Sequence, residues 1–98
     1  MTADQKTEWY YRYGRIYQDK SDFKLAKLYY NLSIQQKAIQ NNWMRAYSCF
    51  HLGLLFEQQA LYAEARRYYN QALTFDQYDF QAGLEQKTKA ALERIKNK

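Results

Sequence analysis

The 98-residue sequence contains no proline, only three glycines and a single cysteine. A β-protein of this length needs many turns, and Gly and Pro are the residues that usually form them. Their scarcity predicts an all-α chain with short connections between helices. No apolar run approaches the roughly 18 residues that a membrane-spanning helix requires, so we expect no membrane span.

Enzyme chemistry and metal binding have little support among the residue types present. Cys49 is the only cysteine and His51 is the only histidine. On a helix, two residues of this spacing point roughly 200° apart, so they form neither a catalytic pair nor a metal site. The glycines at 14, 53 and 83 are too scattered to form a phosphate-binding loop. We therefore predict a non-catalytic protein without a cofactor or a metal.

The cysteine count and the first residues also bear on the compartment. One cysteine cannot form an internal disulfide, which is typical of a protein in a reducing environment. Residues 1–6 lack the apolar segment of a secretory signal. We therefore expect a cytoplasmic protein.

Aromatic residues are abundant, with 11 Tyr, five Phe and two Trp, and 47% of all residues are apolar. This proportion excludes a disordered chain and allows a modest core. The net charge of +5 is uneven, because residues 1–20 carry +1, 21–45 carry +3, 46–84 carry −2 and 85–98 carry +3. Basic segments of this kind suit nucleic acid, an anionic surface or simple solubility.

An internal repeat becomes visible when the sequence is aligned with itself so that Gly14 falls on Gly53. The identical pairs in this register are Gly14/Gly53, Ala26/Ala65 and Tyr29-Tyr30-Asn31/Tyr68-Tyr69-Asn70. Apolar residues within each copy recur three and four positions apart, which predicts two amphipathic helices per copy. Ser21 or Asp22 is the expected N-cap of the second helix. Because glycine inside a helix costs about 1 kcal/mol relative to alanine, we expect the two equivalent glycines to lie where helices approach closely.

This pattern resembles the tetratricopeptide repeat over about residues 7–79. The matching positions are Tyr10, Tyr13-Gly14, Tyr17, Phe23, Ala26 and Tyr30 in copy one, with Ser33 where Ala is usual, and Leu52-Gly53, Phe56, Tyr62, Ala65, Tyr69 and Ala72-Leu73 in copy two. The resemblance implies a single all-α domain over residues 1–98, a helix-turn-helix repeat solenoid of five antiparallel helices. Its expected parts are repeat 1 at about 7–45, repeat 2 at about 46–79 and a capping helix at about 80–96, with helices at about 3–19, 22–40, 43–58, 61–75 and 79–96.

Two features depart from the usual pattern of that family. Gln77 stands where the second helix commonly ends in proline, and the period is about 39 residues where about 34 is usual. Ala38 and Ile39 continue the apolar stripe of the second helix. We therefore expect the additional residues to lengthen that helix, which would end near Asn41 or Asn42.

The residues after Asp79 predict one more amphipathic helix, similar to the helix that closes the end of a solenoid. Its apolar positions, expected to pack on the 61–75 helix, are Phe80, Leu84, Ala91, Leu92 and Ile95. The lysines of this segment are expected to face water.

The resemblance also implies a binding surface, because the first helix of each repeat lines the concave side in this family. The implied partner-binding groove contains Tyr11, Arg15, Tyr47, Phe50, His51, Leu54 and Glu57. Exposed aromatic residues with charges nearby are typical of a partner site. We therefore predict a non-catalytic adaptor that binds a peptide or helix of a partner protein, as a scaffold in complex assembly or signalling. Alternatively, the capping helix folds into the groove and buries these aromatic residues.

A carboxylate clamp is found in the chaperone-binding members of the family. The positions that match it here hold Tyr11, Arg15, His51, Gln81 and Glu85. Only Arg15 could bind a carboxylate and Glu85 would repel one, so we expect no such clamp.

Two other functions stay open. A basic, aromatic-rich chain could bind RNA or DNA, although most tyrosines occupy core positions of the repeat and copy two is acidic, which makes nucleic acid the weaker reading. Two and a half repeats also leave apolar ends, and pairing these between copies would form a homo-oligomer.

Overall fold

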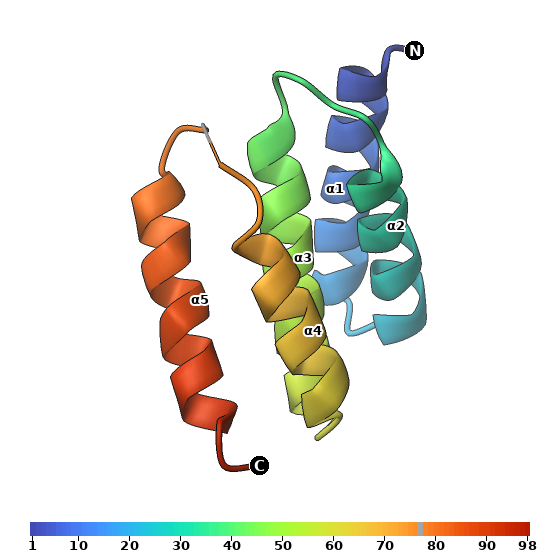
Figure 1. Ribbon diagram of the computed structural model, residues 1–98. Coiled ribbons are helices and arrows are strands. Elements are labelled where there is room, and N and C mark those ends of the chain that lie inside the picture. The colour runs from blue at the N-terminus through green and yellow to red at the C-terminus, as the bar shows by residue number, and fades with distance from the viewer. Residues whose placement is uncertain (77) are drawn as a thin grey trace.

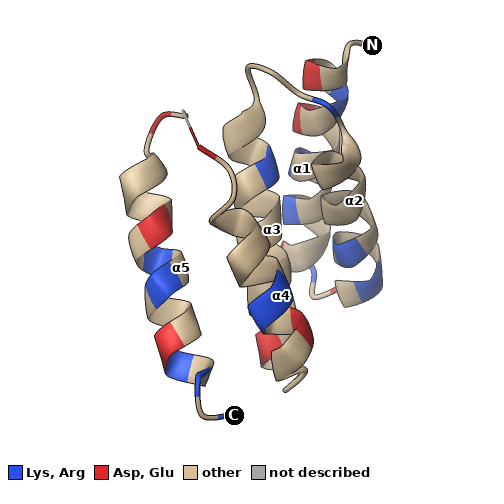
Figure 2. Cartoon of the chain, viewed as in Figure 1, with Lys and Arg blue, Asp and Glu red and all other residues tan. Residues whose placement is uncertain are grey.

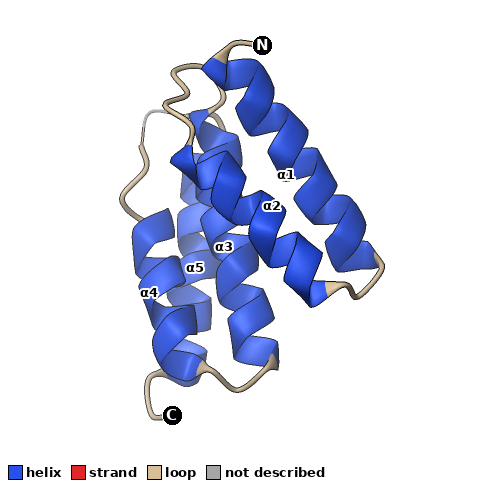
Figure 3. Ribbon diagram, turned by 90° about the vertical axis from the view of Figure 1, so that its right-hand side faces the viewer, coloured by secondary structure: helices blue, strands red, loops and turns tan. Residues whose placement is uncertain are grey.

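The computed structural model describes residues 1–76 and 78–98, and these residues form five α-helices and no strand (Figure 1). The helices are α1 (Ala3–Asp19), α2 (Phe23–Gln35), α3 (Asn42–Gln58), α4 (Tyr62–Ala72) and α5 (Gln81–Ile95). Consecutive helices pack in pairs, α1 with α2 and α3 with α4, while α5 lies against α4 and α3 (Figures 1 and 3). This arrangement confirms the all-α repeat array. No described helix is both long and apolar enough to span a membrane. Gln77, which stands where proline is usual in the family, lies outside the described residues.

The turns within the two helix pairs have the same backbone geometry. Ser21 in the first turn and Ala60 in the second occupy equivalent positions of the repeat, and both are left-handed, with φ of 58° and 59°. The backbone N–H of Asp22 donates to the carbonyl of Tyr17, and that of Leu61 donates to Phe56, both at 2.9 Å. The internal repeat therefore extends to the hydrogen bonds of the turns. Asp22 is the N-cap of α2, as expected, and its side chain accepts the N–H of Leu25 at 3.2 Å.

Each helix pair is in closest contact where a glycine of the first helix faces a tyrosine ring of the second. A Cβ built on Gly14 would lie 2.6 Å from Cδ1 of Tyr30, and one built on Gly53 would lie 2.5 Å from Cδ1 of Tyr69. Both tyrosines are fully buried. This confirms the predicted close approach, because any side chain on these glycines would displace a ring at the centre of the pair.

Two hydrophobic clusters hold the array together. The larger one fills the space between the two helix pairs and includes Leu52, Leu55 and Cys49 of α3 with Tyr30 of α2. The smaller one joins α4 to α5 and contains Ala65, Tyr69, Ala91 and Ile95. The last helix therefore packs on α4, as its apolar positions predicted, and its role as a solubilising cap stays a prediction.

The predicted extension of α2 to about residue 40 is wrong. The helix ends at Gln35, and Gln36 is extended with φ of −72° and ψ of 144°. Oδ1 of Asp4 accepts backbone N–H groups from Ile39, Gln40 and Asn41 at 3.1, 2.9 and 2.9 Å. Three consecutive N–H groups that converge on one oxygen cannot also bond to carbonyls four residues earlier, so this segment forms a loop.

The side chain of Ile39, which the sequence pattern placed on an apolar stripe, is 86% exposed in that loop. The apolar stripe therefore ends with α2 at Gln35 and does not extend to Ile39. Asn41 occupies the N-cap position of α3 but makes no side-chain cap hydrogen bond there, and its side-chain amide donates to the backbone carbonyl of Asp4.

The expectation that Phe80 packs on α4 is also wrong. Phe80 precedes α5 in a left-handed conformation, with φ of 66°, and its side chain is 83% exposed. The other predicted apolar positions of the segment do contact the fold, since Leu84, Ala91 and Ile95 are buried. Because α5 begins only at Gln81, the ring of Phe80 lies beyond the helical stripe that faces α4.

Candidate functional site

Two hollows open along α3 and share Trp43. The first, of about 470 Å³, is lined by residues of α1 and α3, and the second, of about 250 Å³, lies between α3 and the residues just before α5. The first is lined by Tyr11, Arg12, Arg15, Ile16, Trp43 and Met44, and the second by Trp43, Tyr47, Asp79 and Phe80. First helices of consecutive repeats therefore supply most of this surface, which we call the Trp43 surface.

The first hollow combines an aromatic floor with a cationic rim. Tyr11 is buried, and its ring meets Trp43 edge to face with centroids 5.7 Å apart. Nη1 of Arg15 donates to Oη of Tyr11 at 3.2 Å, which holds the exposed guanidinium beside the hollow and raises the pKa of Arg15. Arg12 is exposed and pairs with Glu8 one turn away. This rim can donate hydrogen bonds to a carboxylate.

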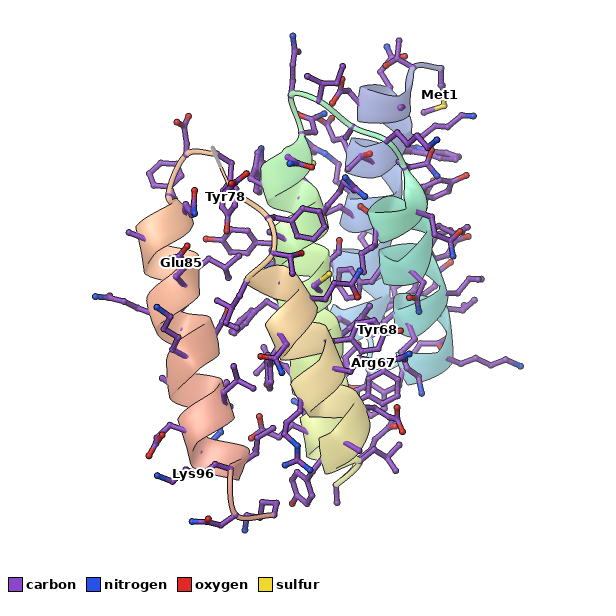
Figure 4. The ribbon with its side chains drawn as sticks, viewed as in Figure 1. Met1, Arg67, Tyr68, Tyr78, Glu85 and Lys96 are labelled. Atoms are coloured by element: carbon purple, nitrogen blue, oxygen red, sulfur yellow. The ribbon has the colours of Figure 1, made fainter. Side chains whose placement is uncertain are left out.

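The second hollow is walled by aromatic rings and carries a carboxylate. The rings of Trp43 and Tyr47 lie 5.8 Å apart and almost perpendicular, at 83°. Phe80 and Asp79 line the opposite side, from the segment that leads into α5. Tyr78 lies close by, together with Glu85 (Figure 4). Burial raises the pKa of Tyr78 to about 12, with contributions from Glu85 and Tyr47, so its hydroxyl stays protonated.

His51 packs among aromatic rings beneath this surface. It stacks on Tyr30 with ring centroids 5.4 Å apart at 7°, and Phe50 meets it edge to face at 5.9 Å. Its Nδ1 is buried without a hydrogen-bond partner. Burial is the main cause that lowers the pKa of His51 to about 4, and the nearby charges of Arg15 and Lys87 act in the same direction. The imidazole is therefore neutral at pH 7 and acts as a packed ring.

The helix α5 covers the other half of the predicted groove. Phe50 and Leu54 pack against the cluster that contains Tyr69 and Ile95. The helix α5 thus fills the part of the predicted groove around Leu54. The predicted groove residues Tyr11, Arg15 and Tyr47 line the two hollows. The capping helix therefore covers one part of the predicted groove and leaves another part open. The role of these residues in binding a partner stays a prediction.

Glu57, the last predicted groove residue, forms an ion pair with α5. Nε and Nη2 of Arg94 donate to its two carboxylate oxygens at 2.6 and 2.7 Å, and the hydroxyl of Tyr69 donates at 2.8 Å. The hydrogen bond from Arg94 is the main cause that lowers the pKa of Glu57. The carboxylate therefore anchors the capping helix.

Sequence reasoning missed Trp43, Asp79 and Phe80. Trp43 precedes Tyr47 by four residues, so both lie on the same side of α3, and this spacing could have indicated it. Asp79 and Phe80 come from the connection before α5, and their position depends on the path of that connection. No periodic signal in the sequence could have found them.

A metal centre and a nucleophilic cysteine find no support among the described residues. Within residues 1–76 and 78–98, no group of three His, Cys, Asp or Glu side chains could hold a metal ion. Cys49 is fully buried, and burial raises the pKa of its thiol to about 12. A thiol that is protonated and inaccessible cannot act as a nucleophile.

A second aromatic surface lies on the α1–α2 pair, at the end of the array where the chain begins. Trp9 meets Tyr13 edge to face at 4.9 Å, and Tyr13 and Tyr17 both stack on Tyr29, at 5.2 and 5.5 Å. Trp9 is 48% exposed. We call these four residues the N-terminal face.

The repeat explains why this face is aromatic. The equivalents of Tyr17 and Tyr29 are Phe56 and Tyr68, which stack in the same way with centroids 5.4 Å apart. In the second repeat α2 covers that pair, and the hydroxyl of Tyr68 donates to Oδ1 of Asn31 at 3.1 Å (Figure 4). The first repeat therefore presents at the end of the array a surface that the second repeat buries.

Comparison with known proteins returned one family. The sequence model described as "Tetratricopeptide repeat" matches residues 8–39 and 46–79, which include most of the two helix pairs. No curated protein and no solved structure matches the chain significantly.

Proposed function

Because this chain belongs to the tetratricopeptide repeat family, whose domains generally mediate protein–protein interactions, we propose that it binds a peptide or helix of a partner protein on the Trp43 surface. The observation that supports this proposal is the pair of adjoining hollows that share Trp43 and lie along the first helices of the repeats. Two hollows that adjoin the same aromatic residue, Trp43, can each take one anchoring side chain of a single ligand segment.

The charges of the first hollow indicate what the partner carries there. Arg15 and Arg12 are both exposed at its rim, and Ile16 is 46% exposed. Arginine binds carboxylates through paired N–H donors, whereas Ile16 and the Tyr11 ring favour an apolar contact. The proposed ligand therefore places an acidic side chain beside an apolar one in this hollow. The protein acts as a non-catalytic adaptor.

The proposal is tested by affinity capture of partners with the purified chain, followed by mass spectrometry and binding measurements with each captured protein. Arg15→Glu reverses the rim charge at an exposed position and is expected to weaken partner binding at least about tenfold. Tyr47→Ala removes a wall of the second hollow and is expected to act in the same direction. Ile39→Ser is the matched control, because Ile39 is exposed on a loop away from both hollows.

Unchanged binding of every captured partner by folded Arg15→Glu and Tyr47→Ala proteins would contradict the proposal. Circular dichroism and thermal melts of the variants establish that they are folded. A partner that responds to changes on the N-terminal face and to neither of these variants would move the binding site to that face.

Self-assembly is a second candidate function, and the N-terminal face is the observation that favours it. In the second repeat the Phe56–Tyr68 stack is covered by a neighbouring helix pair, and the equivalent Tyr17–Tyr29 stack has no such neighbour among the described residues. Contact between the N-terminal faces of two copies would cover the Tyr17–Tyr29 stack of each copy. Sedimentation equilibrium is expected to show a dimer that Trp9→Ser converts to a monomer, whereas Leu61→Ser leaves it intact. A wild-type protein that stays monomeric at high micromolar concentration would exclude this function.

A further inference from the structure

We propose that the second hollow of the Trp43 surface is an aromatic cage for an alkylammonium group, such as the side-chain terminus of a lysine or methylated lysine in the bound partner. This inference rests on the proposed function, because it assigns a ligand chemistry to one of the two hollows. It is carried by the ring geometry, by the charges around the hollow and by the exposure of the Phe80 side chain.

The walls of the hollow have the geometry that a cation requires. Trp43 and Tyr47 are one helical turn apart on α3, and their rings meet at 83° with centroids 5.8 Å apart. Two rings at a right angle form a corner, and a third aromatic residue, Phe80, lines the hollow from the segment before α5. A cation is attracted to the faces of Trp, Tyr and Phe within about 6 Å of the ring centroid. The volume of about 250 Å³ admits one alkylammonium group with its methyl substituents.

The electrostatics of the hollow favour a cation, although the protein as a whole is basic. Asp79 lines the hollow directly, and its carboxylate would repel an anionic ligand. Acidic residues also occur in the connection between α4 and α5 and near the start of α5 (Figure 2). Residues 46–84 carry a net charge of −2 in a chain of +5. A carboxylate beside three rings adds a counter-charge to the attraction of the ring faces.

The helix α3 carries one Lys or Arg side chain, and this side chain is engaged elsewhere. Arg45 donates from Nε to the carbonyl of Ile34 at 2.9 Å, and its guanidinium carbon lies 4.9 Å from the centroid of the Phe75 ring. Both contacts draw Arg45 toward α2 and the end of α4. The chain already uses this chemistry internally, because Nζ of Lys27 also lies 5.1 Å from the centroid of the Phe56 ring.

Phe80 supplies an independent observation. Its backbone is left-handed with φ of 66° and ψ of 19°, a conformation that is unfavourable for a bulky residue, and its side chain is 83% exposed. Ser21 and Ala60 are left-handed in the same way in the turns before α2 and α4, so this backbone geometry is that of a turn. What distinguishes Phe80 is a large apolar side chain that the fold leaves exposed beside the hollow, where a ligand could contact it.

The two hollows then differ in the charge that they accept. The first has arginines at its rim and the second has Asp79. A ligand segment with an acidic residue at one end and a lysine at the other would satisfy both. This polarity fixes the direction in which a peptide lies along α3.

The test compares choline with 3,3-dimethyl-1-butanol, its neutral isostere, in which carbon replaces the quaternary nitrogen. Binding is followed by NMR shifts of the Trp43 indole N–H and of the backbone amides of Asp79 and Phe80, with sodium chloride at equal concentration as the background. Choline is expected to produce saturable shifts in the millimolar range at these positions. The neutral isostere is expected to bind at least about tenfold more weakly.

The variants separate the contribution of the rings from that of the charge. Phe80→Ala and Asp79→Asn are each expected to weaken choline binding several-fold, whereas Asp76→Asn, an exposed acidic residue of the same connection that does not line the hollow, is expected to leave it nearly unchanged. Equal shifts for choline and its isostere, or no saturable shift with choline, would overturn the proposal. Equal losses in Asp76→Asn and Asp79→Asn would also overturn it, because the effect would then be one of general charge.

This experiment fails or succeeds independently of the proposed function. Arg15→Glu lies in the other hollow and is expected to reduce partner binding without reducing the affinity for choline. Choline binding with no partner bound at the Trp43 surface would leave the cage standing and refute the adaptor function. Partner binding at the Trp43 surface, together with equal binding of choline and its neutral isostere, would support the adaptor function and refute the cage.

Discussion

Asp4 and Asn41, although far apart in the sequence, bind each other twice. Oδ1 of Asp4 accepts the backbone N–H of Asn41 at 2.9 Å, and the side-chain amide of Asn41 donates to the backbone carbonyl of Asp4 at 2.8 Å. The same oxygen also accepts the N–H groups of the two residues before Asn41. One carboxylate in the first turn of α1 therefore holds the loop that joins the two repeats.

Replacing Asp4 by alanine is expected to lower the free energy of unfolding by about 1–2 kcal/mol, because three backbone N–H groups lose a charged acceptor. Hydrogen exchange at residues 39–41 is expected to accelerate more than exchange in α3. Glu8→Ala is the matched control, since Glu8 lies one turn further along α1 and loses only an exposed ion pair with Arg12. Such pairs contribute little. Equal melting temperatures for the two variants would show that the Asp4 contacts are not important for stability.

The three glycines are expected to respond differently to alanine. At Gly53 the new Cβ would overlap the ring of Tyr69, and at Gly14 it would overlap Tyr30, so both substitutions are expected to destabilise the fold by about 1–3 kcal/mol. Leucine at either position is expected to unfold it. At Gly83 nothing beyond the adjacent residues and the backbone of α5 itself lies within 4 Å of the new Cβ, and Gly83→Ala is expected to stabilise α5 by about 1 kcal/mol. Denaturant melts of the three alanine variants measure the contrast, which a uniform loss would contradict.

The stability of the fold is expected to fall as the pH decreases from about 6.5 toward 4, because of His51. Its pKa is lowered from 6.5 to about 4 in the folded state, so the unfolded chain binds a proton more readily in this range. The contribution of the neutral imidazole is therefore complete above pH 6.5 and is lost as the pH approaches 4, a difference of about 3 kcal/mol.

His51→Phe keeps a ring against Tyr30 and removes the titrating group. Melting temperatures between pH 7 and pH 4.5 are expected to change less in this variant than in the wild type. The pKa of Glu57 is also lowered, but from an ordinary value of 4.5, so its contribution is lost only at lower pH. Parallel curves for the variant and the wild type from pH 7 to 4.5 would rule out His51 as the source of the pH dependence.

A chain that ends at Asp79 is expected to aggregate or to lose cooperative unfolding. Without α5, the buried Tyr69 and Ala65 and the partly buried Leu54 and Phe50 would face water. Each large apolar side chain that is exposed forfeits roughly 1.5–3 kcal/mol, and small domains are stable by about 5–15 kcal/mol in total. Analytical ultracentrifugation and thermal melts test this expectation. Removal of residues 97–98 alone is the control, and a shortened chain that stayed monomeric and melted near the wild-type midpoint would show that α5 is dispensable.

The repeated helix pairs were predictable because they depend on short-range pattern. The glycine of each first helix and the tyrosine that it faces recur at equivalent positions of both copies, and each such pair meets within one helical hairpin. Amphipathic periodicity and the capping residue Asp22 are also local properties. These features determined the number of helices, the turn between each pair and the residues at the centre of each pair.

Tertiary structure alone decided where the array opens. The end of α2 depends on Asp4, which lies in the first turn of α1, and the exposure of Phe80 depends on the path of the connection before α5. The ion pair of Glu57 with Arg94 joins α3 to α5 and places α5 over one half of the predicted groove. Residue types and spacing specify which side of a helix is apolar, but several helices can cover the same apolar side. Which of them does so is settled by long-range contacts, and these left the Trp43 surface uncovered.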